Sequence, residues 1–180
     1  MTAIRRDEAA GPVGGLPRIS LALLAGAIAI AINTALLAAA DWIPLVTARG
    51  GLLKLLKTYF AEPLAAVGVV ALWARLGLPS PASAAFQSGF HVVVGLAMAV
   101  FYAWAIEPWL PGATWKKGLA YAVAVWLANA FVVLPWIGEG IAGSRALEAP
   151  GMVYFAAAHT VFFVLMAVLY AAFVARWARP

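Results

Sequence analysis

Four long apolar segments dominate this chain of 180 residues, and they restrict the folds open to it more than any other feature. They span residues 19–43, 82–106, 118–137 and 152–175. Each offers roughly the 20 residues that a helix needs to cross the hydrocarbon core of a bilayer. Hydrophobic residues make up 66% of the sequence and charged residues 11%, with a mean hydropathy of +0.96, which lies outside the range of soluble domains. We therefore expect an all-α integral membrane bundle of four transmembrane helices.

The remaining polar residues are too few and too scattered to form a separate soluble domain. We expect a cytoplasmic N-terminal tail over residues 1–18 and a single membrane domain over 19–180. Basic residues lie at the ends of the spans rather than on one face, so we expect no nucleic-acid partner. With the N-terminus inside, seven Lys and Arg residues lie on the cytoplasmic side and five outside, which predicts that both termini are cytoplasmic. The absence of cysteine excludes disulfides and thiolate chemistry.

The stretch from residue 46 to residue 81 does not fit the four-span pattern. It opens with GGLLKLLKTYF, where leucines alternate with Lys54 and Lys57 as in helices that lie in the membrane interface. The apolar run that follows, over 63–74, is short for a span and is bounded by Glu62 and Arg75. We therefore predict an interfacial or re-entrant helix over 46–81 rather than a fifth span.

The only two histidines, His91 and His159, each lie in an apolar segment and precede a tyrosine by eleven residues. The two segments read HVVVGLAMAVFYA and HTVFFVLMAVLYA, and seven of their thirteen positions are identical. In the preceding spans, Asn33 and Asn129 each lie several residues before a tryptophan. We interpret this pattern as an internal duplication of a two-helix unit, although apolar spans also resemble one another by chance.

Helical geometry places these polar residues at a common depth. At a rise of about 1.5 Å per residue, all four lie roughly 10–14 Å below the outer surface. They form a predicted polar layer, which consists of Asn33, His91, Asn129 and His159. The tyrosines lie about 16 Å deeper, so we expect Tyr102 and Tyr170 to be anchors at the cytoplasmic interface.

The simplest role for this layer is to hold helices together, because polar groups in lipid hydrogen-bond across helices. Two alternatives remain open. His91 and His159 are candidate axial ligands of a b-type haem, since they lie at similar depth on different helices. Paired histidines are also suited to taking up protons, because histidine changes charge near neutral pH. Two histidines without carboxylate or cysteine neighbours make a weak metal site, so we expect no metal.

We expect no enzymatic activity from this chain. Ser88 precedes His91 by three residues, but no third member of a catalytic triad is evident. The sequence therefore predicts no catalytic residues.

The chain also resembles a family. GFHVVVGLAMAVFYA, then Asn129 before Leu134, Pro135 and Trp136, then AAHTVFFVLMAVLYA are similar to the YagU-like group of small bacterial inner-membrane proteins. The resemblance covers about Phe90 to Ala172. It implies a four-helix protein of the bacterial inner membrane in which His91, Asn129 and His159 match the pattern, and a role linked to acid stress.

These observations lead to one functional expectation and one alternative. We expect a small non-enzymatic membrane protein whose partners are the lipid bilayer and either a larger membrane complex or further copies of this chain. It would serve as an accessory subunit or a small homo-oligomer linked to proton or stress response, with no cofactor. The alternative is an electron-transfer protein that binds haem b through His91 and His159.

Overall fold

The computed structural model describes residues 15–43, 45–47 and 51–177, and all the regular secondary structure in these ranges is helical. Four of its helices are long and apolar enough to cross a membrane: Pro17–Trp42, Ala84–Ile106, Thr114–Trp136 and Ala149–Trp177. These bounds agree within a few residues with the four predicted spans, so the fold class is confirmed. Of the predicted tail, residues 1–14 lie outside the described residues, and Arg18 already belongs to the first helix.

Each long helix is built from the following elements. The first combines α1 (Gly15–Ala39) with the 3-10 turn η1 (Ala40–Trp42), and the second combines α4 (Ala84–Phe101) with the π-helical turn η2 (Tyr102–Ile106). The third consists of α5 (Thr114–Ala128), the π-helical turn η3 (Asn129–Val133) and α6 (Leu134–Trp136), and the fourth is α7 (Ala149–Trp177). Pro135 explains η3, because proline lacks an N–H donor and its ring displaces the preceding turn.

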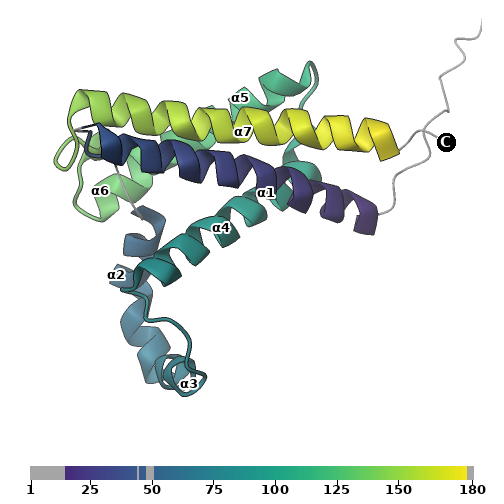
Figure 1. The fold of residues 1–180 in the computed structure, drawn as a ribbon. Helices are drawn as coiled ribbons and strands as arrows, with labels where there is room; N and C mark the ends of the chain where they lie inside the picture. The colour runs from purple at the N-terminus through teal and green to yellow at the C-terminus, as the bar shows by residue number, and fades with distance from the viewer. Residues whose placement is uncertain (1–14, 44, 48–50, 178–180) are drawn as a thin grey trace, which may run out of the picture.

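Helices α1 and α7 lie side by side and antiparallel, α4 packs on α1, and α5 packs on α7 (Figure 1). Pro17 and Trp177 lie together at one end of the bundle, which we call the terminal end. The opposite end, which we call the distal end, carries the loop between α6 and α7. Helices α4 and α7 run in the same direction, and α4 diverges from α1 toward the distal end (Figure 1).

Small residues allow the helices to approach closely. A Cβ added at Gly118 would lie 2.8 Å from the backbone carbonyl oxygen of Phe163, so α5 and α7 meet almost backbone to backbone. A Cβ added at Gly26 would lie 2.6 Å from the Cβ of Ala99, which brings α1 and α4 together in the same way. Membrane helices associate through such contacts, because lipid provides no hydrophobic driving force between them.

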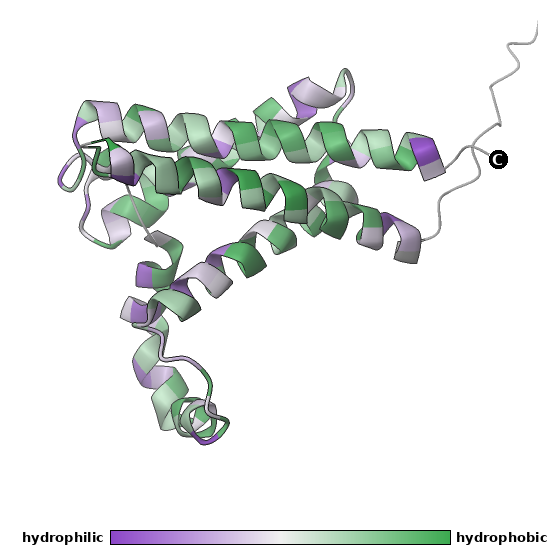
Figure 2. Cartoon of the chain, viewed as in Figure 1, coloured by the Kyte–Doolittle hydropathy of each residue, from purple (hydrophilic) through white to green (hydrophobic). Residues whose placement is uncertain are grey.

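The segment that did not fit the four-span pattern forms two helices, α2 (Gly51–Ala66) and α3 (Val69–Arg75), bent by 86° relative to each other. Gly68 makes the bend with a φ of 78°, a left-handed conformation that glycine adopts without strain. The pair projects from the side of the bundle, and its surface is largely apolar (Figure 2). The predicted additional helix is therefore present, but a bend divides it into two. By length and composition alone, the two helices together could also form a single bent transmembrane span.

The α2–α3 pair is attached to the bundle at both ends. At its start, Lys54 forms an ion pair with Glu139, and Tyr59 makes an edge contact with Trp136 at a ring-centroid distance of 6.4 Å. At its far end, the ring of Trp73 packs on Phe86 of α4 at 5.7 Å. α3 is therefore in direct contact with the distal part of α4.

Candidate functional site: a buried asparagine and two histidines

Asn33 is the buried polar residue at the centre of the bundle, with 1% of its surface exposed. It lies on the small-residue face of α1, which also carries Ala25 and Ala29. Its amide nitrogen donates a hydrogen bond to the backbone carbonyl of Ala158 in α7, at 2.9 Å. Its Oδ1 lies 3.2 Å from Nε2 of His91 in α4. One side chain thus joins three helices.

The hydrogen-bond partners of Asn33 fix the tautomer of His91. A backbone carbonyl only accepts, so the amide nitrogen of Asn33 must face Ala158 and its Oδ1 must face His91. Oδ1 in turn only accepts, so Nε2 of His91 carries a proton and donates it. In the neutral ring, Nδ1 of His91 is then the bare nitrogen.

His159 has the opposite arrangement. Its Nδ1 lies 2.9 Å from the backbone carbonyl oxygen of Phe155, one turn earlier in α7, so Nδ1 must be the donor. In the neutral ring, Nε2 of His159 therefore carries no proton. The ring also packs on that of Phe155, with centroids 4.1 Å apart, which holds its orientation.

The structure brings together three of the four residues of the predicted layer. Asn33 contacts His91 directly and binds the residue next to His159, but Asn129 lies elsewhere. It begins the π-helical turn η3, where its Oδ1 faces the start of α2, 3.7 Å from a Cβ added at Gly51. No hydrogen bond of its side chain is recorded within the described ranges. Asn33 thus has a histidine partner in the next span, whereas no hydrogen bond joins Asn129 to His159 among the described residues.

The haem alternative depends on which ring nitrogen each histidine leaves without a proton. Haem iron is held by imidazole nitrogens, and the commonest protein ligand is a neutral ring whose other nitrogen donates to a carbonyl. His159 matches this description through its bond to Phe155. His91 has the reverse arrangement, because its Nε2 donates to the amide carbonyl of Asn33 and leaves Nδ1 without a proton. The haem alternative therefore stays a prediction, and no group of three or more metal-ligating side chains occurs among the described residues.

A second polar cluster, at the terminal end, was not anticipated from the sequence. Tyr102 and Tyr170 are buried, with 0% and 2% of their surface exposed, and their rings pack edge to face with centroids 6.0 Å apart. The expectation that they are interface anchors is therefore wrong. Nε of Arg18 donates to the hydroxyl of Tyr170 at 3.2 Å, and its Nη2 lies 3.0 Å from a carboxylate oxygen of Glu107. Lys117 also binds Glu107, through the backbone carbonyl at 2.8 Å.

One signal in the sequence points to this second cluster. Arg18 precedes the first span and Glu107 follows the second, so a four-span topology places opposite charges at the same end of the bundle. Between the two clusters α7 contributes apolar core residues, among them Phe162, Phe163 and Met166. The two polar regions are therefore separate sites.

Comparisons with known proteins identified no relative of this chain. No family model matches the chain, and neither a curated protein nor a solved structure is significantly similar to it. The resemblance to the YagU-like group stays a prediction.

Proposed function

We propose that this chain is a small non-enzymatic protein of the bacterial inner membrane in which Asn33, His91 and His159 respond to protons that arrive from the distal end. We place both termini in the cytoplasm, so that the distal end faces outward. The observation that carries the proposal is the hydrogen bond between Asn33 and His91. This bond joins α4 to α1 at the point where the two helices begin to diverge.

The hydrogen bonds of the neutral histidine rings explain why protonation would alter the arrangement of the helices around them. Each neutral imidazole has one bare nitrogen, Nδ1 in His91 and Nε2 in His159. Protonation of either ring adds an N–H donor, for which no acceptor is recorded in the described part of the chain. A charge without a partner is costly in the membrane interior. The charged ring therefore favours an arrangement in which water or a polar group reaches it.

The surroundings limit this response to one proton at first. The side chains in contact with the rings are Asn33 from α1 and Phe155 from α7, and both are uncharged. Asn33 contacts His91 and also binds the carbonyl of Ala158, the residue before His159, so the two rings lie in one region of the bundle and a charge on one disfavours a charge on the other. No carboxylate is recorded in hydrogen-bond contact with either ring within the described residues.

The position of His91 suggests how the signal spreads. Toward the terminal end α4 is fixed on α1 by close contacts, such as that of Gly95 with Ile30. Toward the distal end α4 diverges, and it carries α3 through the contact of Phe86 with Trp73 (Figure 1). A change at His91 would tilt the distal half of α4 and move the α2–α3 pair. The apolar surface of that pair is suited to contact a larger membrane complex or a second copy of this chain.

We infer a sensor rather than a path for protons. The residues of α7 between His159 and Tyr170 are apolar apart from Thr160, whose hydroxyl binds its own helix at the carbonyl of Ala156. Eleven residues of helix correspond to about 16 Å, which is too far for direct transfer between hydrogen-bonded groups. We therefore infer that protons reach Asn33, His91 and His159, which we call the Asn–His site, from the distal side.

A distance measurement tests this proposal. The chain has no cysteine, so Ser88→Cys on the distal part of α4 and Ala35→Cys on α1 give two unique sites for spin labels, both on exposed positions. Distances are measured by double electron–electron resonance in lipid nanodiscs at about pH 7.5 and about pH 4.5, on either side of the range in which histidine titrates. We expect the distance between α1 and α4 to increase on acidification.

Two controls make the result specific. A chain with both His91→Gln and His159→Gln has no histidine, while the glutamine at position 91 can still donate to Asn33, so its distance should not depend on pH. Labels at Ala35→Cys and Val153→Cys report the α1–α7 pair, which should stay fixed. Identical distances at the two pH values, or an equal shift in the variant without histidine, would contradict the proposal.

The assembly state is tested separately. Mild extraction from a bacterial membrane, followed by measurement of native mass, should give an assembly larger than one chain. A mass that is a multiple of 18.9 kDa would indicate a homo-oligomer, and the presence of a second protein in fixed ratio would indicate an accessory subunit. A single species of monomer mass would argue against both.

A further inference from the structure

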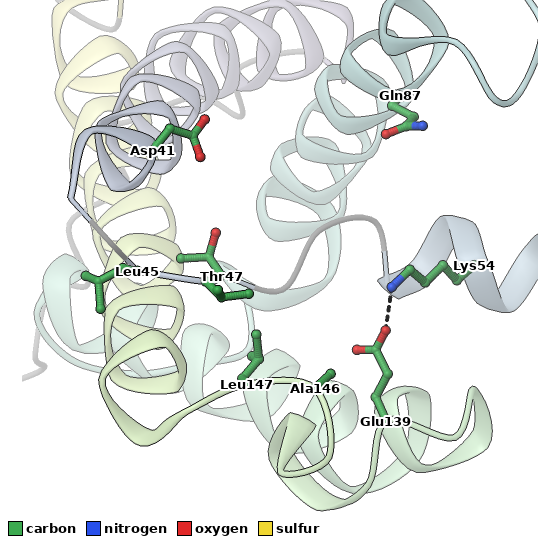
Figure 3. A pocket seen from close by; sticks show the side chains of 9 residues that line it. Asp41, Leu45, Thr47, Lys54, Gln87, Glu139, Ala146 and Leu147 are labelled. Carbon is green, nitrogen blue, oxygen red and sulfur yellow. Dashed lines mark hydrogen bonds and ion pairs between the residues drawn. The ribbon is translucent and has the colours of Figure 1, made fainter.

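A second candidate binding site lies at the distal end, separate from the two histidines. It is a pocket of about 560 Å³ between the end of α1, the starts of α2 and α4, and the loop that leads to α7 (Figure 3). Its polar lining consists of Asp41, Thr47, Lys54, Gln87 and Glu139. Leu45 and Leu147 supply an apolar wall.

One side of the pocket presents a positioned cation. Lys54 is held by its ion pair with Glu139, and α2 is fixed beside it by the contact of Tyr59 with Trp136. An ammonium group has three N–H donors, of which Glu139 takes one. The side chain of Lys54 is 56% exposed, so its other donors remain accessible from the pocket. These donors suit an anionic oxygen group such as phosphate or carboxylate.

The opposite side presents acceptors. Gln87 donates its Nε2 to the backbone carbonyl of Ala82 at 3.1 Å, which leaves its Oε1 as an acceptor. Asp41 contributes a carboxylate from the turn η1, across the pocket from Lys54 (Figure 3). Acceptors of this kind suit a protonated amine. The pocket therefore has the polarity of a receptor for a molecule that carries both charges.

Thr47 gives independent support. Only 7% of its surface is exposed, and its buried hydroxyl has no hydrogen-bond partner among the described residues. Buried polar groups are nearly always satisfied, and an unpaired one marks a place where a water or ligand is missing. Because Thr47 lines the pocket, a ligand with a polar group at this point would satisfy it.

The position of the pocket along the membrane normal indicates the source of its ligand. Trp42 and Trp136, which lie at the distal ends of two spans, are 91% and 64% exposed, as expected for rings at the height of lipid headgroups. The pocket is lined by residues from the same helix ends. It is therefore accessible both to lipid headgroups and to solutes on that side of the membrane.

We propose that this pocket binds a small zwitterion of the phosphate and primary-amine type, the chemistry of phosphoethanolamine, whether free or as a lipid headgroup. Lys54 binds the phosphate, and Asp41 and Gln87 bind the ammonium group. Thr47 hydrogen-bonds the ligand between them. This site goes beyond the proposed proton response and does not depend on it, because none of its residues belongs to the Asn–His site.

The first experiment measures binding of free O-phosphoethanolamine to the purified full-length chain in detergent by isothermal titration calorimetry. We expect saturable binding that Lys54→Gln weakens at least about tenfold, the loss typical of one removed charge-assisted contact. Lys57→Gln is the matched control, because Lys57 lies on the same helix and does not line the pocket. It should bind as the wild type does.

Thr47→Val separates ligand binding from folding. It replaces the unpaired hydroxyl with a methyl group of similar size, so the ligand-free protein should be at least as stable as the wild type. Binding of phosphoethanolamine should nevertheless weaken. A variant that loses stability but keeps its affinity would overturn the role of Thr47.

The second experiment identifies the source of the ligand. The chain is reconstituted in nanodiscs that contain phosphatidylethanolamine and phosphatidylcholine in equal amounts, and the lipid retained after transfer to detergent is measured by mass spectrometry. Enrichment of phosphatidylethanolamine in the wild type and its loss in Lys54→Gln support a lipid headgroup. Binding of the free compound without lipid enrichment supports a soluble ligand. Absence of both, or equal behaviour of Lys54→Gln and wild type, overturns the proposal.

Discussion

Nε2 of His91 donates a hydrogen bond to Oδ1 of Asn33 across 3.2 Å, at the point where α4 leaves α1. The orientation of Asn33 is itself set by its bond to Ala158 in α7. Three helices are thus held by one amide, and the tautomer of His91 follows from it. A proton taken up by His91 would go to Nδ1, because Nε2 already carries the proton that it donates to Asn33.

Replacement of Asn33 should destabilise the bundle. Asn33→Leu removes two interhelical hydrogen bonds and leaves the donor of His91 unpaired, so we expect a loss of about 1–3 kcal/mol in the free energy of unfolding. Unfolding in mixed micelles measures it. Thr34→Val is the control, because the hydroxyl of Thr34 binds only Ile30 of its own helix and its removal should cost less than about 0.5 kcal/mol. Equal losses in the two variants would refute the bridging role.

Asn129 should behave differently from Asn33. Its side chain is partly exposed and has no recorded hydrogen bond within the described ranges, so Asn129→Leu should change the free energy of unfolding by less than about 1 kcal/mol. The comparison of the two asparagine variants tests whether the sequence repeat has kept one functional pair or two. A loss as large as that of Asn33→Leu would show that a second pair forms.

Close packing of α5 on α7 should make Gly118 intolerant of substitution. In Gly118→Ala the new methyl group would overlap the backbone of Phe163 and Val164, so the helices must separate, at a cost of about 1–3 kcal/mol. Gly89→Ala is the matched control in α4. Nothing lies within 4 Å of a Cβ at Gly89, and alanine favours the helix, so stability should be unchanged or rise by up to about 1 kcal/mol. A destabilised Gly89→Ala would count against this account.

The two buried tyrosines should respond in opposite ways to loss of their hydroxyl groups. The hydroxyl of Tyr102 has no partner in the described structure, so Tyr102→Phe should leave stability unchanged or raise it by about 1 kcal/mol. The hydroxyl of Tyr170 accepts from Arg18, so Tyr170→Phe should lower stability by about 0.6–2 kcal/mol. Thermal unfolding in one detergent compares the pair directly. A destabilised Tyr102→Phe would indicate a partner for its hydroxyl.

The spans could be predicted from the sequence because lipid demands about 20 apolar residues in a row, a signal that a linear pattern carries well. The additional helix was also predictable, but its bend was not, because a glycine such as Gly68 permits a left-handed turn without requiring one. The common depth of Asn33, His91 and His159 followed from helical rise. Rotation about each helix axis and the choice of neighbours depend on packing, and these decide which polar groups meet.

Asn129 and the tyrosines illustrate that limit. Asn129 lies in a π-helical turn before Pro135, which alters the direction of its side chain, so a regular helix does not describe its position. Tyr102 and Tyr170 have the depth of interface anchors, but the neighbouring small residues of α1 make room for their rings in the core. Depth is set by sequence position, whereas burial is set by the partner helix.

Solid-state ¹⁵N NMR of histidine-labelled protein in lipid tests the central claim most directly, because the chain has only two histidines. At about pH 7.5 we predict two different neutral tautomers, with the proton on Nε2 in His91 and on Nδ1 in His159, assigned through His91→Gln. On acidification to about pH 4.5 one ring should become an imidazolium before the other. Two identical tautomers at the higher pH, or two neutral rings at the lower one, would contradict the account.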